Sequence, residues 1–130
     1  MGTVAAAKRE LSERADKAFR ALILESTKRV VMRTPVKTGA LMGNWNIAAG
    51  EPDRSADEAK TDKSGTTVIL AAAGLQAPVG DKVYLTNSLP YALPIEAGHG
   101  GRPPGVMVGM VAAEMAVIAR QVAREVKNGL

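Results

Sequence analysis

The chain's one possible acid–base pair lies in its second half, where Glu96 precedes His99 by three residues. His99 is the only histidine, and an imidazole beside a carboxylate is able to exchange protons near neutral pH. A nucleophilic triad needs a third partner, and no residue in the sequence clearly completes one. A lone histidine in a glycine-rich loop is more typical of a solvated or hydrogen-bonding side chain. The sequence therefore predicts no catalytic residue and favours a protein that is not an enzyme, while a small hydrolase that uses His99 and Glu96 stays open as a third hypothesis.

The glycine-rich segment around His99 is a candidate anion site. Residues 98–105 precede an expected helix, and backbone amides at such a place, together with Arg102, are able to bind a phosphate. The segment matches neither the dinucleotide-binding Gly-x-Gly-x-x-Gly pattern nor a P-loop. Because glycines also allow two backbone segments to approach closely, we interpret it as a flexible connector. No cofactor is predicted.

Metal binding is the third possibility that the residue types raise. The absence of cysteine excludes zinc ribbons and fingers, and one histidine excludes a multi-histidine site within one chain. What remains is a group of carboxylates in a polar segment: Asp53, Asp57, Glu58 and Asp62. They lack the pattern of an EF-hand calcium loop. We interpret them as a solvated acidic loop and predict no metal site.

A basic cluster, Lys28, Arg29 and Arg33, lies at the end of an expected helix. The chain has a net charge of +4, with net +4 on residues 1–33 and net −2 on residues 51–65. Such a distribution permits contact with nucleic acid. Cations at a helix C-terminus also complement the helix dipole without any ligand, and no set of aromatic residues accompanies these three. A small basic nucleic-acid-binding accessory protein stays open as the alternative function.

The elements that position these residues follow from the prolines, all seven of which lie between Pro35 and Pro104. Apolar residues at spacings of three and four predict one long helix over about 5–33 and another over about 104–127, with Pro103 and Pro104 in the first turn of the second. Residues 34–103 contain strand-like alternation at 41–49 and 82–87, an exposed polar loop at 50–65 that we expect to be mobile, and a segment at 66–75 that fits strand or helix. The expected fold is α+β, with both long helices packed on a small, mostly antiparallel sheet in a single domain.

The second long helix carries an unusually wide apolar face, which makes it a candidate subunit interface. Its members are Met107, Met110, Val111, Met115 and Ile118. Methionine is also an ordinary filler of irregular cores, so core and interface are equally good interpretations for the three methionines. Aromatic residues are only 3% of the chain, and Trp45 and Tyr91 are therefore each predicted to anchor a core junction.

No apolar run approaches the ~20 residues that a membrane-spanning helix needs, and a charged segment follows Met1 closely in place of a signal peptide. The sequence alone thus favours a soluble cytosolic protein without a membrane partner. Its length of 130 residues suits one domain.

Two segments resemble a known family when taken together. Residues 34–45, Thr-Pro-Val-Lys-Thr-Gly-Ala-Leu-Met-Gly-Asn-Trp, resemble the Thr-Pro-Val-Asp-Thr-Gly-x-Leu-x-x-Ser-Trp signature of neck and tail-completion proteins of long-tailed phages, the group that includes the minor tail protein Z type. Residues 83–98, followed by 104–108 and a helix, resemble the second half of the same proteins. The residues that carry the resemblance are Thr34, Pro35, Val36, Thr38, Gly39, Leu41, Trp45, Tyr84, Asn87, Pro90, Tyr91, Glu96, Gly98, Pro104 and Gly105.

This resemblance covers nearly the whole chain and implies a structural virion component at the junction of head connector and tail. It implies a homo-oligomeric ring, most plausibly of six copies, that contacts head-connector or stopper proteins and tail terminator or tube proteins. DNA would pass through its lumen without sequence-specific binding, and assembly would take place in the cytoplasm of the host bacterium. Two departures stand out: Lys37 replaces the usual Asp, and His99 with two glycines replaces a stretch that usually contains Ser or Thr.

Overall fold

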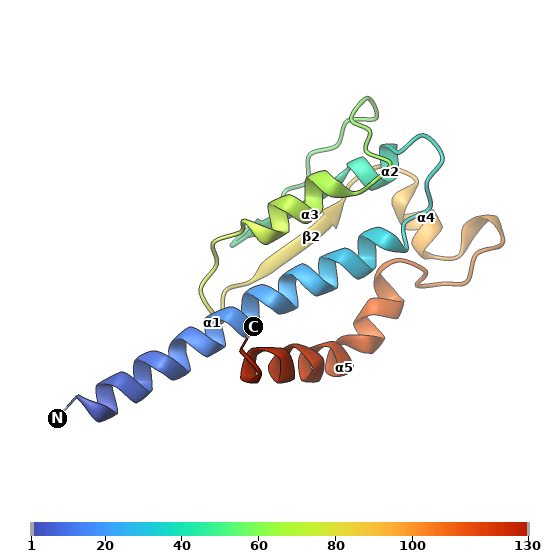
Figure 1. Ribbon diagram of the computed structural model, residues 1–130. Coiled ribbons are helices and arrows are strands. Elements are labelled where there is room, and N and C mark those ends of the chain that lie inside the picture. The colour runs from blue at the N-terminus through green and yellow to red at the C-terminus, as the bar shows by residue number, and fades with distance from the viewer. Residues whose placement is uncertain (1, 130) are drawn as a thin grey trace.

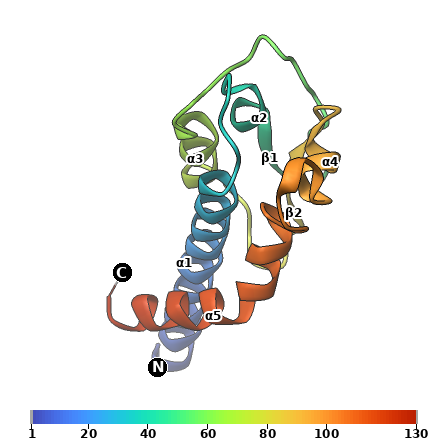
Figure 2. The same ribbon diagram turned by 90° about the vertical axis from the view of Figure 1, so that its right-hand side faces the viewer.

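The computed structural model describes residues 2–129, except for the side chain of His99. It has the expected α+β architecture, in which a long helix from each end of the chain packs with a small antiparallel sheet (Figures 1 and 2). In chain order the elements are α1 (Thr3–Met32), α2 (Ala40–Gly43), β1 (Trp45–Ala49), α3 (Thr66–Ala73), β2 (Val83–Asn87), α4 (Ala92–Glu96), the 3-10 turn η1 (His99–Gly101) and α5 (Val108–Lys127).

Only the second half of α1 contributes to the core. Ile23, Thr27, Val30 and Val31 are buried there, where α1 contacts α3 and α5. Residues 2–15 are exposed throughout, and Figure 1 shows this end of the helix projecting beyond the rest of the molecule. The spacing of three and four predicts that Leu11, Leu22, Ile23 and Val30 share one apolar face of this helix. The C-terminal half of that face is covered, whereas Leu11, at 65% exposure, lies in solvent.

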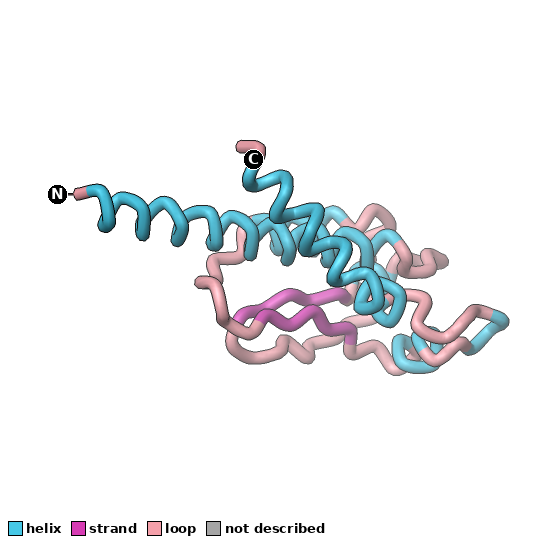
Figure 3. Tube along the Cα trace, turned by 90° about the horizontal axis from the view of Figure 1, so that it is seen from below, coloured by secondary structure: helices cyan, strands magenta, loops and turns pink. Residues whose placement is uncertain are grey.

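The sheet consists of two strands that pair antiparallel (Figure 3). The register places Trp45 opposite Asn87 and Ala49 opposite Val83. The strand predicted at 82–87 is thus confirmed, but the strand predicted at 41–49 begins only at Trp45. Residues Ala40–Gly43 form the short helix α2 instead, because all four are buried and the alternation of a strand is absent from them.

The C-terminal helix begins later than predicted, at Val108 in place of residue 104. Gly105 has a φ of +75°, which no right-handed helix contains, so Pro103 and Pro104 lie outside α5. Figures 1 and 2 show α5 bending part-way along its length and running beside α1. Its buried residues are spaced for a helix: Val111, Ile118, Val122 and Val126. The ambiguous segment 66–75 is helical, as α3.

The polar loop 50–65 is exposed, as predicted, but side chains fix its path. Asn44 is fully buried, and its amide donates to the carbonyls of Ala40, Asp57 and Lys60 at 2.7, 2.9 and 3.2 Å. Its Oδ1 accepts the Asp57 amide at 2.8 Å. The hydroxyl of Thr86 donates to the carbonyl of Asp53. The loop is therefore held at both the α2 end and the β2 strand.

Asp62 closes this loop and starts α3. Its carboxylate accepts the backbone amides of Thr67, Ser64 and Gly65 at 2.9, 3.0 and 3.2 Å and the Ser64 hydroxyl at 2.7 Å. These bonds, the Thr67 amide first and the Ser64 hydroxyl second, hold the pKa of Asp62 far below its usual range. The carboxylate satisfies amides that the first turn of a helix otherwise leaves unpaired.

We expect Asp62→Asn to destabilise the protein by about 0.5–1 kcal/mol at neutral pH, since an amide accepts fewer of these bonds and carries no charge. The pKa of Asp62 is lower in the folded protein than in the unfolded chain. Its contribution to the free energy of unfolding is therefore complete above about pH 4 and is lost as the pH falls. Urea unfolding at pH 7 and pH 3 measures both effects, and the difference between Asn and Asp should shrink in acid. Asp81→Asn, an exposed control, should have little effect. An equal loss in both variants would contradict the cap.

Candidate functional site

The first motif segment is tied to the core through Trp45. This side chain is only 5% exposed, and its Nε1 donates to the Thr34 hydroxyl at 2.8 Å. Thr34 in turn donates to the Val30 carbonyl at 2.9 Å. The chain Val30–Thr34–Trp45 therefore links the end of α1 to the first residue of β1. The prediction that Trp45 anchors a core junction is confirmed.

A second link joins the two motif segments to each other. Asn87 pairs with Trp45 in the sheet, and its side-chain amide donates to the Leu41 carbonyl at 2.7 Å. The Asn87 Oδ1 accepts the Leu89 amide at 3.3 Å, where the chain leaves β2. One asparagine thus fixes the start of the second segment against α2 of the first.

Glu96 caps the N-terminus of α5. Its Oε1 accepts the amides of Met107 and Val108 at 3.0 Å each, and its Oε2 accepts the Gly109 amide at 2.8 Å. The Glu96 carbonyl also accepts the Gly105 amide at 2.7 Å. With both carboxylate oxygens on backbone amides, the arrangement of Glu96 is that of a helix cap.

We expect Glu96→Ala to lower the free energy of unfolding by about 2 kcal/mol, because three amides at the start of α5 lose a charged acceptor. Glu96→Gln keeps one acceptor oxygen and should lose less. Urea unfolding followed by circular dichroism measures the difference. If both variants are as stable as the parent protein, Glu96 does not cap α5 in solution.

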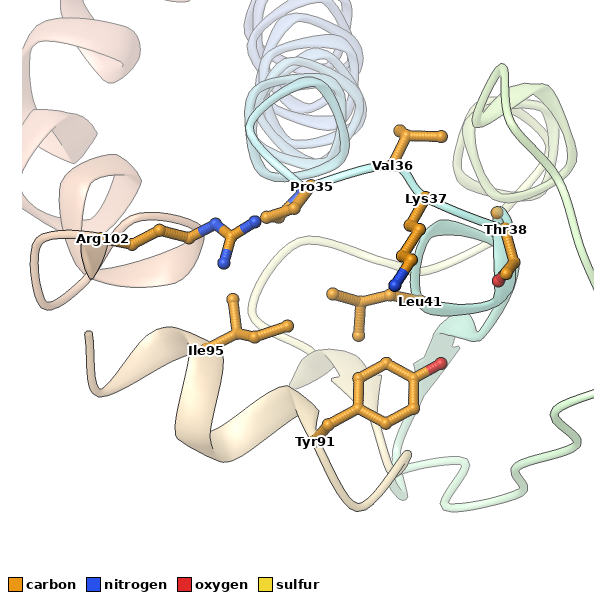
Figure 4. Close-up of a pocket in the computed structure, with 9 residues that line it drawn as sticks. Pro35, Val36, Lys37, Thr38, Leu41, Tyr91, Ile95 and Arg102 are labelled. Atoms are coloured by element: carbon orange, nitrogen blue, oxygen red, sulfur yellow. The ribbon is translucent and has the colours of Figure 1, made fainter. Parts of the chain in front are cut away.

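The two motif segments face each other across a pocket of ≈ 410 Å³. It is lined by Pro35, Val36, Lys37, Thr38, Gly39, Leu41, Tyr91, Ile95 and Arg102. Figure 4 shows the Lys37 and Arg102 side chains entering from different sides, with Leu41 and Ile95 between them. Tyr91 lies at the rim with 36% of its surface exposed, so the prediction that it anchors the core is wrong. Tyr91 belongs to the exposed turn before α4, and its side chain therefore stays at the surface.

The remaining motif residues shape the backbone around this pocket. Gly39 has a φ of +88°, and its carbonyl accepts the amides of Gly43 and Asp62 at 2.8 and 2.9 Å. Gly98 has a φ of +101°, and a Cβ there would stand 2.9 Å from the Arg102 carbonyl. Pro90 lies with Tyr91 in the turn before α4 and is exposed, Pro104 is exposed, and Tyr84 is half-buried in β2. The side chain of His99 lies outside the described part of the molecule, so the predicted pairing with Glu96 is not addressed.

The acidic residues of the loop are used locally. Asp53 accepts the amide and hydroxyl of Ser55 at 3.0 and 2.7 Å, which lowers its pKa, and Asp57 accepts the Ala59 amide at 2.9 Å. Glu58 is exposed. Within the part of the chain that the structure describes, no three His, Cys, Asp or Glu side chains are grouped to hold a metal ion. Nor does any described helix have the length and apolar character to cross a membrane.

Two of the three residues in the predicted basic cluster contact carboxylates. Glu114 of α5 pairs with Arg29 at 2.7 Å and with Arg33 at 2.5 Å, and Arg29 also contacts Glu25 at 3.0 Å. The Arg33 hydrogen bond is the main reason that the pKa of Glu114 is lowered, and the Glu25 hydrogen bond is the main reason that the pKa of Arg29 is raised. The cluster therefore joins α1 to α5, and Lys28 is its exposed member.

The predicted interface on α5 is mostly core. Met107, Val111 and Ile118 are at most 3% exposed, and Met115 packs against the same cluster. A buried side chain presents no surface to a neighbouring subunit, which corrects the interface prediction for Met107, Val111 and Ile118, whereas Met115 is only partly buried. Met110 is the exception at 45% exposure. It shares the outer face of α5 with Val117, which is 53% exposed.

Three comparisons bear on what the chain is related to. No family model, no curated protein and no solved structure matches it.

Proposed function

We propose that this protein is a structural component of the phage neck, similar to tail-completion and head–tail joining proteins. It would form part of a homo-oligomeric ring, with six copies as the expected number, between the head connector and the tail tube. Its partners would be other copies of itself and the connector or stopper and tail proteins above and below. Double-stranded DNA would pass through the lumen. The protein would assemble in the host cytoplasm and reside in the virion.

The observation that carries the proposal is the way the two resembling segments interlock. They are separated by nearly forty residues in sequence. Nevertheless Asn87 bonds to Leu41, Trp45 pairs with Asn87, and both segments line one pocket. Residues that carry the resemblance thus contact one another and connect the two segments. A chance likeness of two short segments gives no reason for such an arrangement.

The mass of the purified protein over a range of concentrations tests the proposal. Light scattering should show a discrete species of about six chains, each of 13.6 kDa. Electron microscopy of the same fraction should show rings. Mixing with a head connector or tail tube provides the second arm, because some rings form only on a partner. A chain that stays monomeric alone and with both partners contradicts the proposal.

A DNA titration separates the alternative function from this one. A nucleic-acid-binding accessory protein should bind a short duplex tightly at low salt and lose affinity steeply as salt is added. A neck protein with DNA in its lumen should bind such a duplex weakly and without sequence preference. Tight, sequence-dependent binding by a monomer would favour the alternative.

A further inference from the structure

The pocket between the motif segments is lined by two cations, Lys37 and Arg102. Among the described residues, neither Lys37 nor Arg102 takes part in any salt bridge or side-chain hydrogen bond. No carboxylate lines the pocket, and the nearest glutamate in sequence, Glu96, is occupied by three amides of α5. The two positive charges are thus uncompensated where they face the same cavity.

The positions of the two cations depend on the backbone. Lys37 follows Pro35 and Val36 in the segment that leaves α1, and it points toward Leu41 and Tyr91 (Figure 4). Arg102 follows η1, and its Nη1 would lie only 3.1 Å from a Cβ added at Gly100. A glycine at that position leaves room for the guanidinium to lie back toward Pro35 and Ile95.

The floor between the cations is apolar. Pro35, Leu41 and Ile95 line it, and the exposed ring of Tyr91 closes one end. An inorganic anion would satisfy the charges but leave this apolar surface uncovered. A ligand that fills the cavity needs negative charge at the edges and an aliphatic group in the middle.

We infer that this pocket binds a short acidic segment of a partner protein. One carboxylate lies at Lys37, another lies at Arg102, and an aliphatic side chain covers Leu41 and Ile95. Guanidinium and ammonium groups bind carboxylates through charge-assisted hydrogen bonds, and the apolar floor adds burial that a nucleic-acid backbone does not offer. Two cations in a concave pocket differ from the extended row of cations that tracks a phosphate backbone.

The test uses the full-length, ¹⁵N-labelled protein and the peptide acetyl-Leu-Glu-Leu-Asp-amide at low salt. Amide signals of Val36, Lys37, Leu41 and Tyr91 should shift in a saturable way, and the affinity should fall as salt is added. Acetyl-Leu-Gln-Leu-Asn-amide, the neutral counterpart, should bind more weakly by a factor of at least about ten. Inorganic phosphate and a short DNA duplex form the competing arms.

Substitutions assign the binding to the two cations. Lys37→Gln and Arg102→Gln should each weaken acidic-peptide binding about three- to fivefold. Both residues are exposed, so the variants should remain folded, and their amide spectra report this directly. Lys82→Gln, an exposed cation outside the pocket, is the matched control and should bind as the parent protein does.

Four results would overturn the inference. In the titration these are the absence of a saturable shift at the pocket and equal binding of the neutral peptide. In the variants and the competition they are equal weakening by Lys82→Gln, and displacement of the acidic peptide by phosphate or DNA at concentrations lower than the peptide needs for binding. The inference stands on the pocket and not on the neck function. Failure of the peptide titration leaves the ring mass unaffected, and a monomeric mass leaves the titration unaffected.

Discussion

Replacing Trp45 with alanine is expected to lower the free energy of unfolding by about 3–5 kcal/mol, the range for removing a buried aromatic side chain. Trp45 packs in the same cluster as Val30 and Leu41, and it begins β1 opposite Asn87. Its loss leaves a cavity where α1, α2 and the sheet meet. Because domains of this size have about 5–15 kcal/mol of stability in total, the substitution should remove a large share of it and shift the midpoint of urea unfolding to a much lower concentration.

Urea unfolding followed by circular dichroism measures this effect, since Trp45 is the only tryptophan and its fluorescence disappears with it. Trp45→Phe keeps most of the apolar volume but removes the Nε1 donor to Thr34, and it should lose less than the alanine variant. Thr34→Val removes the acceptor and leaves the indole N–H unpaired, at a cost of about 1–3 kcal/mol. A loss below about 1 kcal/mol for Trp45→Ala would contradict a core position.

The same substitution separates folding from assembly. If the proposed ring depends on the fold of the motif region, Trp45→Ala should weaken or abolish the ring because the cavity loosens the packing of α1, α2 and the sheet. Lys37→Gln and Arg102→Gln should leave the ring-forming chain folded, since both side chains are exposed. A soluble Trp45→Ala protein that still assembles would mean that the motif contributes neither to folding nor to the ring.

The long helices and β2 were predictable because each has a clear period over many residues. The spacing of Val111, Ile118, Val122 and Val126 identifies a helix regardless of its neighbours. Ends were harder to predict, because they depend on single backbone angles. The start of α5 is set by Gly105 and by the acceptors of Glu96, and neither shows in the pattern of apolar residues.

Burial was predicted less well than secondary structure. Leu11 and Leu22 occupy the same predicted face of α1. Leu22 packs against the core and Leu11 does not, because the rest of the chain covers only the second half of the helix. The methionines at the start of the second long helix were equally hard to assign. Met107 is buried and Met110 exposed, although sequence alone gave core and interface equal weight for both.

The candidate pocket was outside the reach of sequence reasoning. The sequence indicates Arg102 as part of a candidate anion site on the glycine-rich loop, and Lys37 as a departure from a motif, but nothing in their spacing places them at one cavity. Their proximity follows from the sheet pairing of Trp45 with Asn87, which brings the segments that flank the two strands together. Asn44 was missed for the same reason, because its partners Asp57 and Lys60 come from a loop without periodicity.

The second large effect is expected at Gly65, where α3 meets α1. Gly65 has a φ of +74°, and an added Cβ would stand 2.3 Å from Cγ1 of Val31. Val31 is fully buried, and a β-branched side chain in a helix has one strongly preferred rotamer, so it is unable to move aside. Gly65→Ala should therefore combine the cost of a left-handed backbone, about 1–2 kcal/mol, with an overpacking cost of about 1–3 kcal/mol.

Gly50→Ala is the matched control for Gly65→Ala. Its φ of +87° is similarly left-handed, but an added Cβ meets no described atom within 4 Å. The control should lose only the backbone cost, so the difference between the two midpoints of urea unfolding isolates the contact with Val31.

Val31→Ala in the Gly65→Ala background should recover part of the overpacking cost, because it removes the methyl group that blocks the new Cβ. Equal losses at Gly50 and Gly65, or no recovery in the double variant, would show that α3 and α1 are packed less closely than described. A close contact at this point would mean that α3 is fixed against α1, together with Asp62, whose amide donates to the carbonyl of the pocket residue Gly39.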